Sequence, residues 1–183
     1  MKKIIFLFIL ISSTLLGAEN NSNKSEFGFA LGTGIGFGLT FKTGLSENTA
    51  IRFTGGFIGN GGGDNRYKSK SEKNSLNYNI ASQINYSIQK NDSMNIYFSF
   101  AVTHSYELRN TYNFDPHYDG KPNKVKEYDT RGALGFGLAN YFSDSLSLTL
   151  EVHQVFEYSY KPDKNLKNFY MYPTLGLAIG ILF

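Results

Sequence analysis

The sequence predicts an all-β fold: an eight-stranded, antiparallel, up-and-down β-barrel that crosses a membrane. Two observations predict it. Apolar residues alternate with small or polar residues through most of the chain beyond residue 25, which is the pattern of strands whose two faces meet different environments. The connections also alternate between very short turns and longer polar segments, as in membrane barrels with tight turns at one end and long loops at the other.

Residues 1–18 predict a signal peptide that is cleaved from the mature protein. Two lysines precede a short apolar run, and small residues lead to a cleavage site after Ala18. The run is too short to span a bilayer as a helix, which takes about 20 residues. Residues 19–25 then predict a short periplasmic tether and residues 26–183 a single barrel domain. The chain has no cysteine, so no disulfide can stabilise it.

Strands are expected wherever apolar residues occupy every second position. Polar turn-forming residues separate consecutive strands at Ser46–Asn48, Lys90–Ser93 and Ser143–Ser145. The expected strands cover residues 26–32, 37–45, 51–57, 76–88, 94–108, 131–142, 146–160 and 169–183.

The division between the first two strands rests on strand parity. Residues Glu26–Lys42 alternate without a break and would form one strand, for a total of seven. Bacterial single-chain membrane barrels have an even number of strands. The segment Thr33–Gly36 contains two glycines, which permit the positive φ of a tight hairpin. We therefore expect a turn there and eight strands.

The last strand carries the most specific signal. From Phe169 onward the odd positions are apolar, the even positions apart from Leu182 are small, polar or tyrosine, and the sequence ends at Phe183. This segment resembles the terminal strand of bacterial outer-membrane β-barrels, in which the last aromatic residue belongs to the signal that the insertion machinery reads.

The mature chain as a whole resembles the small eight-stranded outer-membrane barrels: the OmpA transmembrane domain, OmpX and the opacity-type surface proteins. The resemblance rests on the strand pattern, the leader and the terminal Phe183. It implies a protein that is inserted in the outer membrane after its signal peptide is cleaved. It also implies a monomer. The partners that it implies are outer-membrane lipid and lipopolysaccharide, the barrel-assembly machinery during biogenesis, and a surface ligand that the sequence does not identify.

Periodicity alone leaves a soluble alternative open. A lipocalin-like barrel turns its apolar face inward, and a soluble β-sandwich has the same period of two. Strands of about fifteen residues, where five or six is usual, favour the membrane barrel. The unequal lengths of the connections favour it as well.

The polar faces of the strands predict a charged network inside the barrel. Eight strands enclose just enough space for side chains to fill, and buried charges are costly unless they pair. We therefore expect a salt-bridged plug, with a narrow pore as the alternative. Glycines on the same faces leave room either for these long side chains or for a lipid tail. The expected network comprises Lys42, Arg52, Glu107, Arg131, Glu151, His153 and Glu157.

The expected function is non-enzymatic, structural or surface-binding, and is carried by the long polar loops 59–73 and 109–129. We expect no cofactor and no metal ion. Removal of the leader takes away Lys2 and Lys3 and lowers the formal net charge from +3 to about +1, and a nearly neutral chain gives no reason to expect nucleic-acid binding. The main alternative is a lipid A-modifying enzyme, for which His104 and Ser105 invite comparison. Neighbours in a strand point to opposite faces, however, whereas a nucleophile and its base must lie within hydrogen-bonding reach.

Overall fold

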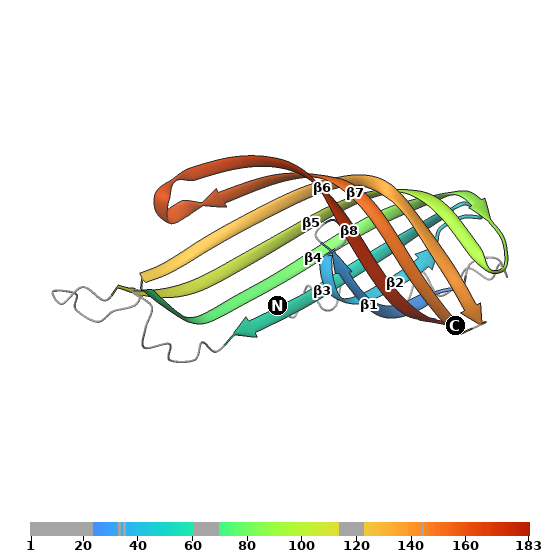
Figure 1. The fold of residues 1–183 in the computed structure, drawn as a ribbon, viewed down its shortest axis with the longest axis horizontal. Coiled ribbons are helices and arrows are strands. Elements are labelled where there is room, and N and C mark those ends of the chain that lie inside the picture. Colours follow the sequence, from blue (N-terminus) through green and yellow to red (C-terminus); the bar gives the residue numbers. More distant parts are fainter. Residues whose placement is uncertain (1–23, 33, 35, 61–69, 114–122, 144) are drawn as a thin grey trace.

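The fold is an eight-stranded closed barrel in which every strand pairs with its sequence neighbours and β1 pairs with β8 (Figure 1). This confirms the predicted all-antiparallel, up-and-down architecture. The computed structural model describes residues 24–32, 34, 36–60, 70–113, 123–143 and 145–183. The elements are β1 Glu26–Gly32, β2 Gly36–Gly44, β3 Thr49–Asn60, β4 Lys70–Lys90, β5 Met94–Asn113, β6 Asn123–Ser143, β7 Leu146–Lys161, the 3-10 helix η1 Pro162–Lys164 and β8 Leu166–Leu182.

The first hairpin is present, so the count of eight strands is confirmed. β1 ends at Gly32 and pairs there with Gly36, the first residue of β2. Gly36 has a φ of 78°, in the left-handed region that glycine adopts readily. Both strands are short, with seven and nine residues against 20 or 21 in β4, β5 and β6.

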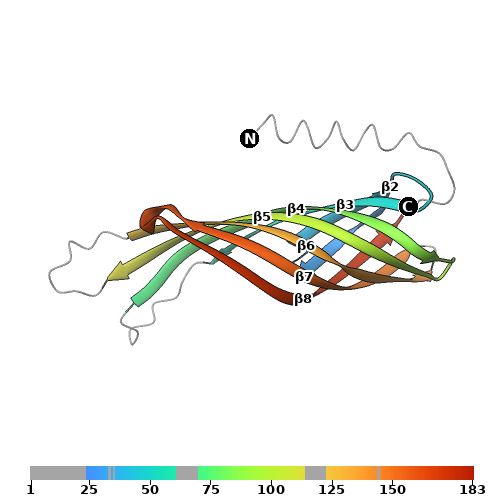
Figure 2. The same cartoon turned by 90° about the horizontal axis from the view of Figure 1, so that it is seen from above.

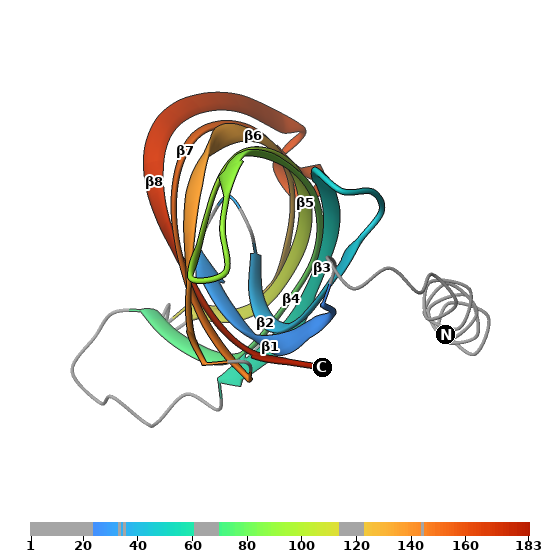
Figure 3. The same ribbon diagram turned by 90° about the vertical axis from the view of Figure 1, so that its right-hand side faces the viewer.

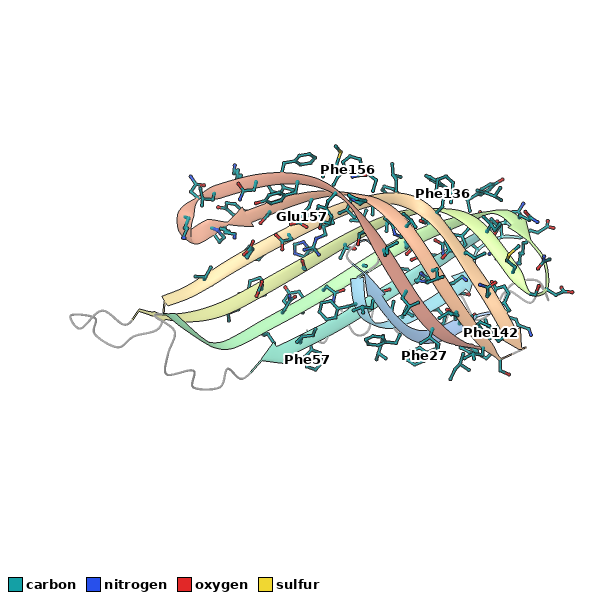
Figure 4. The ribbon with its side chains drawn as sticks, viewed as in Figure 1. Phe27, Phe57, Phe136, Phe142, Phe156 and Glu157 are labelled. Atoms are coloured by element: carbon teal, nitrogen blue, oxygen red, sulfur yellow. The ribbon has the colours of Figure 1, made fainter. Side chains whose placement is uncertain are left out.

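The two faces of the wall are apolar outside and polar inside. Phe27, Phe57 and Phe136 are 48%, 79% and 59% exposed and point away from the barrel (Figure 4). The largest buried side chains are instead polar, and Arg52 and Glu151 are each 1% exposed. A soluble barrel or sandwich would bury its large apolar side chains, so this distribution excludes both soluble alternatives.

The chain end at Phe183 and the turns after β2, β4 and β6 lie at one end of the barrel, here called the proximal end (Figure 2). Ser25 and Phe183 exchange backbone hydrogen bonds of 3.1 and 3.0 Å there, so the last residue of the expected tether is already paired. At the opposite, distal end the wall is uneven. The β1–β2 hairpin stops part of the way along, whereas β4, β5 and β6 continue well beyond it (Figure 1).

The bounds predicted for the long loops, 59–73 and 109–129, are wrong, because the flanking strands continue into them. β4 already begins at Lys70, while β5 ends at Asn113 and β6 begins at Asn123. Polar residues occupy both faces of these strand ends, so no alternation marks them in the sequence. The remaining central parts of both loops lie outside the described residues.

The predicted signal peptide, residues 1–18, and the tether as far as residue 23 also lie outside the described residues. Within the part of the chain that the structure describes, no helix has both the length and the apolar character needed to cross a membrane.

Candidate functional site

The barrel lumen is the candidate site, because polar side chains from opposite walls meet in its proximal half. Glu151 on β7 lies at the centre. Its Oε1 atom accepts hydrogen bonds from Arg52 Nη1 at 2.9 Å, from Gln83 Nε2 at 2.6 Å and from the Tyr97 hydroxyl. The side chains of Arg52 and Glu151 are both 0% exposed. This salt bridge is therefore fully removed from water and ties β3 to β7 across the lumen.

A second buried ion pair lies beside this network at the proximal end. Glu26 and Lys42 are direct partners in the β1–β2 register, and Lys42 Nζ lies 3.4 Å from Glu26 Oε2. The ammonium group also lies 6.0 Å from the centroid of the Tyr97 ring. Cross-strand neighbours of opposite charge stabilise a sheet, and the two pairs together balance the charge of the proximal lumen.

Glycines on the lumen face make room for these large side chains. A Cβ atom added at Gly137 would overlap the ring of Tyr97, and one added at Gly180 would overlap the carboxyl group of Glu26. Small residues therefore stand opposite large ones, as the narrow interior of an eight-stranded barrel requires. Of the two roles left open for the glycines, these two positions make room for long side chains.

Gly34, between β1 and β2, lies in the lumen beyond the network, and the ends of both strands lie within the ring of strands in Figure 3. The Gly34 carbonyl oxygen accepts a hydrogen bond of 3.1 Å from Thr103 Oγ1 on β5. Gly34 also lies against the ring of His153 on β7. The side chain of Asn79 holds the start of β2 through hydrogen bonds of 3.0 and 2.9 Å to the backbone of Phe37. Gly34 thus lies across the lumen, between Thr103 on β5 and His153 on β7.

The distal lumen holds its own polar cluster. Arg131 Nε donates to Glu157 Oε2 at 2.6 Å, and the Tyr172 hydroxyl donates to the same oxygen at 2.5 Å. Arg131 Nη2 lies 3.4 Å from Asp129 Oδ2. The side chains of Arg131 and Glu157 are 18% and 13% exposed. Unlike the proximal pair, this pair keeps some contact with solvent.

The predicted lumen residues are divided between these two clusters. His153 faces the lumen as expected, and its Nε2 atom lies 2.9 Å from Ser99 Oγ. Glu107 lines the distal lumen from β5. The proximal lumen contains Lys42, Arg52, Glu151 and His153, and the distal lumen Glu107, Arg131 and Glu157.

Sequence reasoning did not assign roles to Tyr97, Gln83 and Tyr172, the neutral partners of the two key carboxylates. All three occupy lumen-facing positions in the alternation of their strands. For Tyr97 a further signal exists, because it is the direct cross-strand partner of Gly137. A large polar residue opposite a glycine on the lumen face predicts a side chain that crosses the barrel.

The structure does not bring His104 and Ser105 together. His104 is exposed on the outer face, where its Nδ1 atom lies 3.1 Å from Thr130 Oγ1, while Ser105 is buried on the lumen face. The residues that the structure describes also contain no group of histidine and acidic side chains arranged to hold a metal ion.

No protein-family profile matches the sequence, and no curated protein matches it either. Solved structures with a similar fold include a major outer membrane protein from Thermus thermophilus, with a TM-score of 0.54 and 14% identity over 87% of this chain and 99% of that one. The fold is that of a small outer-membrane barrel. The attachment invasion locus protein Ail of Yersinia pestis gives a TM-score of 0.48 at 13% identity, covering 88% of this chain and 97% of its own. The N-terminal β-barrel domain of Pseudomonas aeruginosa OprF gives 0.47 at 14%, covering 90% and 98%.

Proposed function

We propose that this protein is an integral outer-membrane barrel with a non-enzymatic, structural or surface-binding role. The apolar outer face supports the membrane location, because contiguous large apolar side chains in contact with water are unfavourable. The lengths of β4, β5 and β6 support the role. A membrane crossing takes about 9–11 residues, whereas these strands have 21, 20 and 21 residues.

A row of tyrosines supports the position of the membrane boundary on these strands. The rings of Tyr78, Tyr106 and Tyr128 lie side by side, with centroids 5.3 and 5.0 Å apart. Tyrosine is enriched at membrane–water interfaces, where its ring is partly buried and its hydroxyl stays wet. From Tyr106, β5 continues to Asn113, which adds roughly 20 Å of strand. The three strands would thus form a stiff ribbon above the membrane, suited to contact a partner.

The two alternatives have weaker support. A pore needs an open path, but the Arg52–Glu151 pair and the turn at Gly34 both lie across the lumen. An enzyme using His104 and Ser105 needs these side chains in contact, and they lie on opposite faces of the wall.

Membrane insertion is tested by gel mobility of the membrane-extracted protein, heated and unheated, with and without protease added to intact cells. A closed barrel stays compact in detergent until it is boiled, so we expect a heat-dependent shift. We also expect cleavage within residues 61–69 or 114–122 by external protease. A soluble protein without a shift would overturn the membrane location.

The surface role is tested by shortening the ribbon while keeping the barrel closed. Leu108 pairs with Lys126, so joining them through an Asn-Gly turn removes residues 109–125 and preserves the register. A matched control replaces residues 114–122 with a Gly-Ser segment of equal length. We expect the shortened variant to keep its heat-dependent shift but to lose the surface-binding or envelope phenotype that loss of the whole protein causes. Phenotypes identical to wild type would refute this role for the ribbon.

A further inference from the structure

A group of polar and small residues interrupts the apolar outer face of the wall on β5, β6 and β7. Gly132 lies at its centre on β6, next to Thr130 on the same face of that strand. His104 on β5 and Gln154 on β7 lie on either side. His104 and Thr130 are exposed, and Gln154 is half-buried between inward-facing neighbours on β7. These four residues are here called the outer patch.

The outer patch lies on the proximal side of the tyrosine row that marks the membrane boundary. His104 lies two residues from Tyr106 of that row. Gln154 lies six residues from Tyr160, which pairs directly with Tyr128 and so extends the row onto β7. Six residues of tilted strand rise about 15 Å, which is within the apolar band of about 25 Å on membrane barrels. In a membrane the outer patch is therefore surrounded by acyl chains.

The Gln154 amide has an apolar environment on this face. Its direct neighbours on the outer face are Leu134, Val152, Phe156 and Pro173. A polar side chain in hydrocarbon costs free energy unless it forms hydrogen bonds. Acyl chains carry no hydrogen-bonding group, so lipid tails leave this cost in place. The amide is better matched by a partner that itself donates and accepts hydrogen bonds.

Gly132 leaves the outer patch open to close approach. A Cβ atom added there would have no neighbour within 4 Å, while the adjacent Phe156 points away from the barrel (Figure 4). Between helices in membranes, small residues let two backbones pack closely, and polar side chains beside them form hydrogen bonds between the two surfaces. The same physics applies to the outer face of a sheet, so the outer patch is suited to contact another protein surface.

The polar groups of the outer patch complement one another. His104 Nδ1 lies 3.1 Å from Thr130 Oγ1, so this contact uses one ring nitrogen and leaves Nε2 for another partner. An imidazole nitrogen and a carboxamide can each donate or accept, so His104 and Gln154 are able to bind each other. Within one chain they are too far apart, because they lie two strands and four register positions from each other.

The strand register places His104 and Gln154 symmetrically about Gly132. Gly132 pairs with Val102 on β5 and with Phe156 on β7. His104 lies two residues beyond Val102 toward the distal end, whereas Gln154 lies two residues from its own strand's partner of Gly132 toward the proximal end. A row of paired residues crosses tilted strands and rises toward the distal end from β5 to β7 (Figure 1). This rise offsets much of the difference in register, so the imidazole and the amide flank Gly132 at similar heights.

We propose that the outer patch is the interface of a two-fold symmetric dimer in the membrane, with a second copy of this chain as the partner. A two-fold axis along the membrane normal brings the two Gly132 backbones together. His104 of each copy then faces Gln154 of the other, so the same contact is made twice, as in isologous interfaces generally. The proposal rests on the membrane location proposed above, and it departs from the monomer that the family resemblance implies.

The interface is tested by cross-linking, because the natural chain has no cysteine. Gly132→Cys places a thiol on the proposed axis, and the control Phe29→Cys places one on the outer face of β1. Both variants are oxidised in intact outer membranes, and the heat-dependent gel shift confirms that each is folded. We expect a disulfide-linked dimer for Gly132→Cys and only the baseline of random collisions for Phe29→Cys.

The hydrogen bonds are tested by the dimerisation constant, measured by sedimentation equilibrium in detergent micelles. One bond between membrane-embedded side chains contributes roughly threefold, and Gln154→Leu removes two symmetric bonds, so dimerisation should weaken about eightfold. His104→Leu should weaken it similarly, and the double variant no further, because both substitutions remove the same bonds. The control Asn140→Leu removes an outward polar side chain near the proximal end of β6 and should change nothing.

The outcomes separate this proposal from the membrane location. Without a heat-dependent shift the protein is not a membrane barrel, and both proposals fail. If the barrel inserts but Gly132→Cys cross-links no better than Phe29→Cys, only the dimer is refuted. A cross-link from Gly132→Cys to a protein of another size would identify a different partner and would refute it as well. A dimerisation constant that Gln154→Leu leaves unchanged would have the same consequence.

Discussion

The proximal and distal halves of the lumen use the same residue types in opposite ways. In the proximal half Arg52 and Glu151 are fully buried, and eight paired strands enclose them. In the distal half Arg131 and Glu157 keep partial exposure, and the wall is open above the β1–β2 hairpin. The comparison shows that charge inside a barrel does not define a function. Enclosure by the wall decides whether an ion pair is a structural element or remains accessible to a ligand.

The energetic cost of breaking an ion pair should differ accordingly, and the largest effect is expected at Arg52. Arg52→Met leaves Glu151 buried without its cation, which should destabilise the barrel by about 3–5 kcal/mol. The second substitution Glu151→Leu in the same chain should restore much of this loss, because the uncompensated charge is then removed. Urea titration in detergent micelles, read by the heat-dependent gel shift, measures both. If Arg52→Met were as stable as wild type, the conclusion that the proximal half encloses the ion pair away from water would be wrong.

Packing in the proximal half should also be intolerant of small additions. Gly137→Ala forces a methyl group into the Tyr97 ring, and overpacking of this kind costs about 1–3 kcal/mol. Gly132→Ala, on the same strand, is the matched control because an added Cβ there has no neighbour within 4 Å. The same urea titration should show a clear loss for the first variant and almost none for the second. Similar results for both would mean that the lumen near Tyr97 can relax.

The smallest effect is expected for the distal pair. Arg131→Met removes a cation whose side chain is 18% exposed, so its cost should lie between about 1 kcal/mol or less for an exposed pair and about 3–5 kcal/mol for a fully buried one. Its unfolding midpoint should therefore lie between that of wild type and that of Arg52→Met. A loss as large as that of Arg52→Met would show that the distal cluster is enclosed too, and the contrast between the halves would disappear.

The sequence was sufficient for the barrel itself because a membrane and a lumen impose opposite demands on successive residues. Phe27 and Phe29 alternate with glycine and alanine for this reason, and the same alternation runs to Phe183. The signal stops where both faces of a strand are polar. Asn110–Asn113 and Asn123–Lys126 therefore look like loop although they pair as strands.

The contacts inside the lumen were less predictable than the residues that make them. Alternation places Arg52 and Glu151 on the lumen face, but their pairing joins positions 99 residues apart in strands that are not neighbours. Such a contact depends on how far each strand is staggered when the barrel closes. The inward fold of the turn at Gly34 depends on the same geometry, so the sequence pattern alone did not reveal it.

The seam between β1 and β8 has a consequence for the order of folding. It joins Glu26 to Leu182 and contains only seven residue pairs, followed by the hydrogen bonds between Ser25 and Phe183. Loop-closure entropy grows with sequence separation, so this pairing should form after the local hairpins. Until then the chain is an open curved sheet, and its two edge strands, β1 and β8, carry unpaired backbone N–H and C=O groups that can pair with another chain. The interval before closure is therefore when the nascent protein is most vulnerable to misassembly.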